Sequence, residues 1–94
     1  MAWKEVNLKH WAKEAGIDIN EIDQKLKLRE VIIKLRKKRG LTQAEVAASI
    51  NVSRSRIAQI ETGVKLHKTS FDVLLRIIQA LGYRYVIKAE RLAA

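Results

Sequence analysis

Apolar residues recur every three or four positions through the middle of the chain, as they do on the buried face of a helix. The first such stretch predicts a helix over residues 21–39. Its apolar positions are Ile22, Leu26, Leu28, Ile32 and Leu35. Gly40 follows directly, and a glycine commonly ends a helix because it adopts left-handed backbone angles without strain.

Three shorter helices are predicted between Gly40 and Gly82, each opened by a hydroxyl residue that can cap its first turn. Thr42 opens the first of them and forms a capping box with Glu45. Ser53 opens the second. Thr69 or Ser70 opens the third. We expect their buried positions to be Val46, Ala47 and Ile50, then Ile57, Ile60 and the stem of Glu61, then Phe71, Leu74, Leu75 and Ile78.

The segments before and after this region predict two further elements. Residues 83–88 are rich in aromatic and β-branched residues, which predicts a short C-terminal β-strand. At the front, residues 7–15 predict a short helix with Trp3, Leu8 and Trp11 as apolar anchors. The expected fold class is therefore all-α, with four to five helices and one short strand.

Charge and composition narrow the function. The net charge is +9 over 94 residues, which favours polyanions because binding to phosphates releases condensed counterions. The chain has no cysteine, so disulfides and thiolate metal sites are excluded. Charged residues interrupt every apolar run and the N-terminal stretch, so we expect a cytoplasmic protein without a signal peptide, a membrane span or a membrane partner.

Enzyme chemistry has little support in the sequence. His10 and His67 lie in different segments, without the spacing of metal ligands or a catalytic triad. There is no glycine-rich loop for a phosphate. We therefore expect no catalytic residues, no metal and no cofactor.

Two segments carry a family resemblance. The run Thr42–Ala47 resembles the opening of the Cro and lambda-repressor type of helix-turn-helix, and Ile57–Gly63 resembles its close. Asn51 stands where this family usually has glycine, and asparagine is the next-best residue at positive φ. The resemblance implies a lambda-repressor-like bundle that binds double-stranded operator DNA. It also implies an internal ion pair between Arg36 and Glu61.

The predicted helix-turn-helix domain covers residues 28–82. It follows an N-terminal extension over residues 1–27, which holds the short helix and the start of the first long helix. Residues 83–94 form the strand and a tail.

Helical geometry selects the residues that would read DNA. Ser55 and Gln59 point away from the inner face of their helix, and Arg54 lies at its N-terminus, where helices inserted in the groove touch base edges. Arg56 projects sideways, toward a phosphate or a neighbouring base. By resemblance, Gln43 clamps a phosphate. The predicted DNA-binding residues are Gln43, Ser53, Arg54, Ser55, Arg56, Gln59, Thr62, Lys65 and Lys68. The alternative for each is a solvated surface side chain.

A single helix-turn-helix covers little DNA, so we expect a homodimer on paired half-sites. An isolated strand leaves backbone groups unpaired on both edges, and pairing with its own copy would satisfy one of them. The predicted dimerisation residues are Tyr83, Tyr85, Val86 and Ile87. The alternative is a strand folded back on its own domain.

The small size, the N-terminal extension, Leu81-Gly82 and the terminal strand together resemble the HigA- and HipB-type antitoxins. That resemblance implies a toxin partner, either a RelE- or HigB-like ribonuclease or a HipA-like kinase. Trp3 and Trp11 are candidates for holding the partner, because tryptophan is enriched among interface anchors; alternatively they cover the end of the first helix. A stand-alone, phage-like regulator and a protein-interaction scaffold of the same fold remain alternatives.

Overall fold

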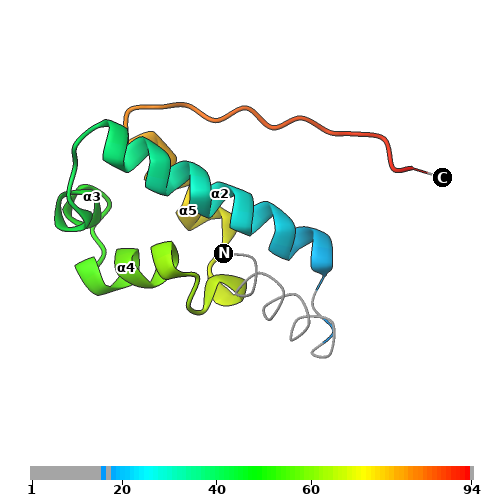
Figure 1. The fold of residues 1–94 in the computed structure, drawn as a ribbon, viewed down its shortest axis with the longest axis horizontal. Coiled ribbons are helices and arrows are strands. Elements are labelled where there is room, and N and C mark those ends of the chain that lie inside the picture. Colours follow the sequence, from blue (N-terminus) through cyan, green and yellow to red (C-terminus); the bar gives the residue numbers. More distant parts are fainter. Residues whose placement is uncertain (1–15, 17, 94) are drawn as a thin grey trace.

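The described part of the chain, Gly16 and residues 18–93, consists of four α-helices and one short 3-10 helix in a computed structural model (Figure 1). The elements are α2 (Ile19–Lys38), α3 (Gln43–Ser49), α4 (Arg54–Thr62), η1 (Leu66–Lys68) and α5 (Phe71–Ala80). The expected all-α class is confirmed. The predicted helix over 7–15, Trp3 and Trp11 lie outside the described residues.

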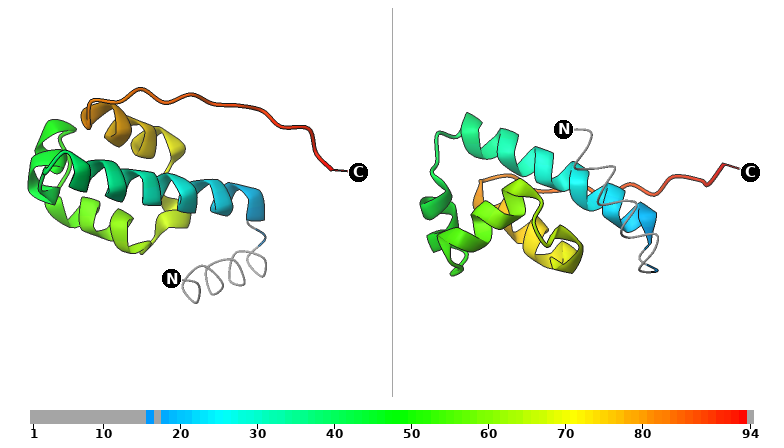
Figure 2. Two further views of the ribbon diagram at one scale, coloured as in Figure 1. Left: turned by 45° about the horizontal axis from the view of Figure 1, so that its top comes forward. Right: turned by 60° about the horizontal axis from the view of Figure 1, so that its bottom comes forward.

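The long helix α2 is the element against which most others pack. It contacts α4, η1 and α5, while α3 packs on α4 and on α5. Figures 1 and 2 show the two short helices α3 and α4 together on one side of α2, with α5 on another side. One helix therefore supports both the α3–α4 pair and the helix that leads to the C-terminus.

The core lies where these helices meet. Its buried apolar residues are Ile22, Leu26, Ile32, Val46, Ala47, Ile57, Ile60, Leu66, Leu74, Ile77, Ile78 and Leu81. The predicted inner faces of α3 and α4 are confirmed at Val46, Ala47, Ile57 and Ile60. Ile22 and Leu26 show that the core reaches further toward the N-terminus than residue 28.

The predicted buried face of α5 needs a correction at two positions. Leu74 and Ile78 are buried as expected, but Ile77 is also fully buried, whereas Phe71 is 36% exposed at the start of the helix. α5 lies between α2 and α3, so its buried face is wider than a single stripe. Phe71 instead borders a groove that is described below.

The helix ends follow the capping residues of the sequence. Thr42 and Glu45 form the predicted capping box, and the hydroxyls of Ser53 and Ser70 accept the first-turn N–H groups of α4 and α5. Asn51 takes the left-handed conformation, with φ of 58°, in the turn between α3 and α4. Local chemistry thus accounts for the boundaries of the α3–α4 unit.

The predicted strand over residues 83–88 is absent: no strand occurs within Gly16 and residues 18–93. Residues 83–93 form an irregular segment that runs back over α2 and α5 (Figure 1). A strand needs a second extended segment beside it for its ladder of hydrogen bonds. The described part of the chain places none there, so aromatic and β-branched composition alone does not produce a strand.

A clamp between the ends of α2 and α5 fixes where this segment leaves the core. The guanidinium of Arg39 donates a hydrogen bond to the carbonyl of Leu81. Gly82 follows with φ of +88°, and a Cβ atom at this position would overlap the Arg39 guanidinium. Gly82 therefore suits the left-handed backbone angles, and a Cβ atom there would shift the Arg39 guanidinium away from its present position beside the Leu81 carbonyl.

We expect Gly82→Ala to lower the free energy of unfolding by about 2–4 kcal/mol, from left-handed strain and the displaced Arg39 hydrogen bond. Gly40→Ala is the matched control, because Gly40 also has positive φ, +66°, but faces open space. It should cost only the strain, about 1–2 kcal/mol. Urea denaturation of both variants measures the difference. Equal losses would show that the Arg39 clamp adds no stability.

Candidate nucleic-acid interface

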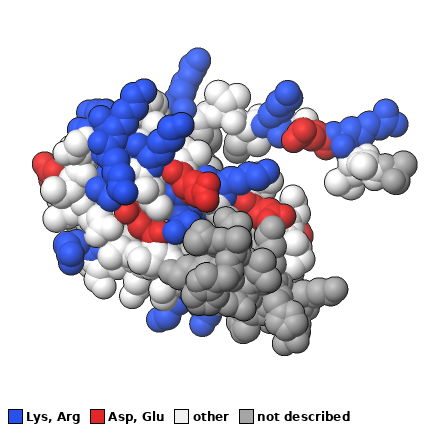
Figure 3. Space-filling view, in the orientation of Figure 1, with Lys and Arg blue, Asp and Glu red and all other residues white. Residues whose placement is uncertain are grey.

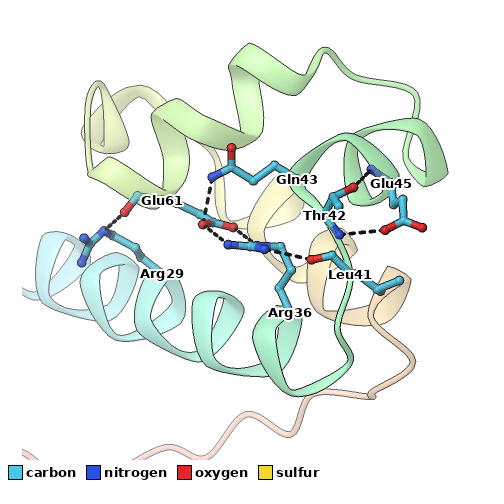
Figure 4. A network of polar contacts seen from close by, with 7 residues as sticks. All are labelled: Arg29, Arg36, Leu41, Thr42, Gln43, Glu45 and Glu61. Carbon is cyan, nitrogen blue, oxygen red and sulfur yellow. Dashed lines mark hydrogen bonds and ion pairs between the residues drawn. The ribbon is translucent and has the colours of Figure 1, made fainter.

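The inner side of α4 is tied to α2 by a buried ion pair (Figure 4). Arg36 donates through Nε to Oε2 of Glu61 at 2.6 Å and through Nη2 to Oε1 at 2.9 Å. Both side chains are largely buried, 14% and 8% exposed. Two parallel bonds from a planar guanidinium fix orientation as well as distance. The ion pair predicted from the family resemblance is confirmed.

Two further hydrogen bonds from α2 hold α3 and α4 in place. Arg36 also donates from Nη1 to the carbonyl of Leu41, just before α3, at 2.8 Å. Arg29 donates from Nε to the backbone carbonyl of Glu61 near the end of α4, at 2.6 Å. α2 thus holds the unit at its beginning and at its end (Figure 4).

Gln43 belongs to the same network. Its Nε2 donates to Oε1 of Glu61 at 3.1 Å, across the start of α3 and the end of α4 (Figure 4). An amide nitrogen carries two hydrogens, so one remains for a second acceptor after Glu61 is satisfied. The predicted phosphate contact of Gln43 is thus chemically compatible with its role inside the protein.

The network sets the charge of Glu61. Burial raises the pKa of its carboxyl, but hydrogen bonds from Arg36 and Gln43, with the charges of Arg36 and Lys37, lower it more. The pKa of Glu61 therefore lies below its ordinary value of 4.5. The hydrogen bond to Glu61 in turn raises the pKa of Arg36, against its desolvation. The pair is ionised at neutral pH.

The opposite side of α4 carries polar side chains with no internal role. Arg54 and Ser55 are exposed and Gln59 is partly exposed. Within residues 18–93 none of their side chains makes a hydrogen bond or an ion pair. The inner residues Ile57 and Ile60 are at most 1% exposed. α4 is therefore a rigidly seated helix whose outer donors and acceptors are available to a ligand.

The first turn of α4 carries basic side chains and no acidic one. It contains no acidic residue, although Asp or Glu would be favoured by the partial positive charge of a helix N-terminus. Arg54 and Arg56 stand there instead. The N-terminus of α4 thus lacks the acidic residues that would stabilise it, and such departures from the stabilising sequence are expected at functional sites.

The remaining predicted DNA-binding residues lie around α4. Ser53 caps the helix by accepting from the Arg56 backbone N–H at 3.0 Å. Thr62 is exposed at its last turn and donates to the backbone carbonyl of Gln59. Lys65 and Lys68 are exposed beyond it, at the start and the end of η1.

Three arginines with structural contacts were not identified as such from the sequence. Arg29 and Arg39 bind backbone carbonyls as described above, and Arg76 donates to the carbonyl of Ile50 at 3.3 Å, which braces the turn between α3 and α4. All three act on residues more than 25 positions away, so no local pattern reveals them. In this basic chain the sequence offers no signal that separates them from solvated arginines.

A short helix joined to its predecessor by a tight left-handed turn, with an anchored inner face and an open polar outer face, defines a helix-turn-helix fold of DNA-binding regulators, which are typically not enzymes. The family model described as helix-turn-helix matches residues 32–86, more than half of the chain, and the chain belongs to this family, of the Cro type. No curated protein matches the chain. No solved structure matches it either.

The described residues also bear on membrane insertion and on metal binding. No helix there has the length and the apolar character to cross a membrane. No three His, Cys, Asp or Glu side chains within the same residues are placed to hold a metal ion.

Because the pKa of Glu61 is lowered in the folded state, its carboxylate stabilises the protein above pH 4.5 and loses this contribution as the pH falls below that value. We expect Glu61→Gln to lower the free energy of unfolding at pH 7 by about 3 kcal/mol, since Arg36 stays buried without its counter-ion. At pH 3 the variant and the wild type should differ much less.

Urea denaturation at the two pH values measures this difference. Glu30→Gln is the matched control, because Glu30 is exposed on the same long helix and has no side-chain partner among residues 18–93. A loss at pH 3 as large as the loss at pH 7 would contradict an electrostatic role for Glu61.

Proposed function

We propose that this protein is a sequence-specific transcriptional repressor that inserts α4 into the major groove of its operator. The observation that carries the proposal is the division of α4 into two sides. Ile57, Ile60 and Glu61 anchor it, while Arg54, Ser55 and Gln59 face outward without partners in the described part of the protein. A protein-docking surface has no need of this polar set.

The three outer side chains have the chemistry of base recognition. Arginine donates two hydrogen bonds to O6 and N7 of guanine, and glutamine bonds to N6 and N7 of adenine. Serine contacts either kind of edge. Arg54, Ser55 and Gln59 would therefore select a short run of bases, with Arg54 contributing the strongest preference.

The surrounding residues would hold the backbone of the DNA. Gln43 retains one amide hydrogen beyond its bond to Glu61, and Ser53 retains its hydroxyl hydrogen beyond its cap. The other proposed phosphate contacts are Arg56, Thr62, Lys65 and Lys68. The net charge of +9 adds an attraction that is independent of sequence and falls with salt.

We expect Arg54→Ala to cost about 1–3 kcal/mol in binding to the operator and to relax the preference at one base pair. Binding is measured by gel shift or fluorescence anisotropy on the region upstream of the gene, on single-base mutants and on random DNA. Lys68→Ala is the matched control, because loss of a phosphate contact weakens all sequences alike and reduces the salt slope by about 1. An Arg54→Ala variant that lost affinity equally on all sequences would contradict base readout by this residue.

The proposal includes a homodimer. A dimer places two α4 helices in successive major grooves, about 34 Å apart, and so doubles the sequence that is read. Tyr83, Tyr85, Val86 and Ile87 are the proposed contacts between the two copies. Val86 and Ile87 are 83% and 78% exposed, so their apolar side chains are available for such a contact.

A narrower form of the proposal makes the protein the antitoxin of a type II toxin–antitoxin pair, which represses its own operon and neutralises a toxin. It rests on the small size, the extension before α2 and Leu81-Gly82, which resemble those of HigA- and HipB-type proteins; the terminal strand that was part of this resemblance is absent from residues 18–93. The toxin would be a RelE- or HigB-like ribonuclease or a HipA-like kinase, held by the N-terminal extension with Trp3 and Trp11.

Co-expression with the product of the adjacent gene tests this form. A toxin should co-purify with the wild type, and Trp3→Ala with Trp11→Ala should release it while operator binding persists. If the product of the adjacent gene neither inhibits growth nor co-purifies, the protein is a stand-alone regulator and not an antitoxin. Absence of binding to any upstream DNA would favour a scaffold of the same fold instead.

A further inference from the structure

An apolar groove lies between α2, α5 and the C-terminal segment, residues 83–93. It has a volume of about 500 Å³, within the range of roughly 300–1,000 Å³ that is usual for small-molecule sites. Its apolar lining consists of Leu28 from α2, Phe71 and Leu75 from α5, and Tyr85, Val86 and Ile87 from the segment. None of its described lining residues comes from α3 or α4, so the groove is separate from the proposed DNA-binding surface.

Phe71 forms a fixed wall of this groove. The ammonium group of Lys25 lies 5.2 Å from the centroid of the Phe71 ring, which is the distance of a cation–π contact. Lys25 is only 3% exposed. It donates to Oε2 of Glu21 at 2.8 Å and to the backbone carbonyl of His67 at 3.3 Å. The Phe71 ring is therefore held in place although it is partly exposed, and this wall of the groove is preformed.

The C-terminal segment covers the groove without hydrogen bonds along its length. Its start is fixed, because Arg39 donates to the carbonyl of Leu81 and the N–H of Tyr83 donates to the carbonyl of Ile78. From residue 84 to residue 93, no hydrogen bond is made to any described residue. A ligand can therefore enter beneath residues 85–88 without breaking a hydrogen bond within the described part of the chain.

The polar lining residues lie together at one end of the groove. The segment runs back along α2 toward the N-terminal end of that helix (Figures 1 and 2). Gln24 is the described lining residue nearest to that end of α2, and Lys88 is the one furthest along the segment. Lys88 is also the one charged residue in the described lining. The groove thus combines an apolar body with a positively charged end.

The surroundings of that end also favour an anion. The segment carries Arg84, Lys88 and Arg91 against a single acidic residue, Glu90. Figure 3 shows these charges along the segment, and further Lys and Arg side chains gathered over the helices beside it. A ligand that complements the groove therefore has an apolar body and one negative charge at its end.

We propose that the groove binds a medium-chain fatty carboxylate. The acyl chain lies between Leu28, Leu75 and Ile87, and the carboxylate accepts hydrogen bonds from the Lys88 ammonium and the Gln24 amide. A charge-assisted hydrogen bond is stronger than one between neutral groups, so Lys88 selects an anion over a neutral or cationic molecule with the same chain. The ligand covers part of Ile87, which is 78% exposed without it. This site goes beyond the proposed repressor and does not depend on operator binding.

Isothermal titration calorimetry of the full chain with sodium decanoate, below its critical micelle concentration, tests the site. We expect saturable binding of one decanoate per chain and much weaker binding of decyltrimethylammonium, which has the same chain length and a cationic head. Absence of saturable binding, or equal binding of the two probes, would overturn the proposal. Decanoate binding that weakens as the protein concentration rises would assign the groove to a second copy of the chain, and would overturn it as well.

Two charge variants separate a specific contact from the general attraction of anions to a basic protein. Lys88→Gln and Arg91→Gln each remove one positive charge from the same exposed segment, but only Lys88 is in the described lining. Lys88→Gln should raise the Kd for decanoate about tenfold. Arg91→Gln should raise it less than about twofold, because it removes only a screened, distant charge. Equal losses of affinity would contradict a carboxylate contact at Lys88.

A second pair of variants tests the apolar part of the site. Ile87 and Leu92 are 78% and 92% exposed on the same segment, and only Ile87 lines the groove. Ile87→Ser removes apolar surface that the acyl chain would cover, and should raise the Kd for decanoate about tenfold. Leu92→Ser should leave the Kd unchanged. Decanoate binding that is indifferent to Ile87→Ser would place the ligand elsewhere and overturn the proposal.

Discussion

A carboxylate on the buried side of α4 determines how that helix is oriented in the domain. Glu61 receives two hydrogen bonds from Arg36 and one from Gln43, and its backbone carbonyl receives one from Arg29. These groups come from α2 and α3, so the position of α4 is defined relative to both. A helix of nine residues has little stability alone. Its geometry is therefore a property of the network more than of its own sequence.

The hydrogen-bond network around Glu61 connects the residues that hold α4 in place with a residue proposed to bind DNA. Gln43 donates to Glu61 from the first turn of α3, while its second amide hydrogen remains for the proposed phosphate contact. Arg36 fixes the chain before α3 through the Leu41 carbonyl as well as the end of α4. The side chains that set the angle between the two helices are thus adjacent to the point where the DNA backbone is proposed to pass.

Much of the fold could be predicted because its signals are local. Thr42 with Glu45, Ser53 and Ser70 mark helix starts by their own side-chain chemistry, and helical spacing identified Ile57 and Ile60 as the inner face of α4. The ion pair of Arg36 with Glu61 came from the family resemblance, since the two residues are 25 positions apart. The outer residues of α4 followed from the same helical geometry, although their contacts with DNA remain predictions.

The other features of the fold could not be predicted from local sequence, because they depend on which elements pack beside each residue. Ile77 is buried and Phe71 is not, since α5 packs on two neighbours instead of one. The composition of residues 83–88 suits a strand, but strand formation needs an extended neighbour that the described residues do not provide. Arg39 looks like one more charge in a basic run, yet it clamps Leu81 through the close approach that Gly82 permits.

The separation of anchoring and outward-facing positions on α4 has a consequence for evolution. Substitutions at positions 54, 55 and 59 disturb neither the buried apolar contacts nor the Glu61 network, so they change what the helix touches with little penalty in folding. Under the proposed mode of binding, a lineage of such proteins can acquire new target sequences through a few exchanges on one short helix. Repeated gene duplication could then yield regulators that share one scaffold and ignore each other's sites.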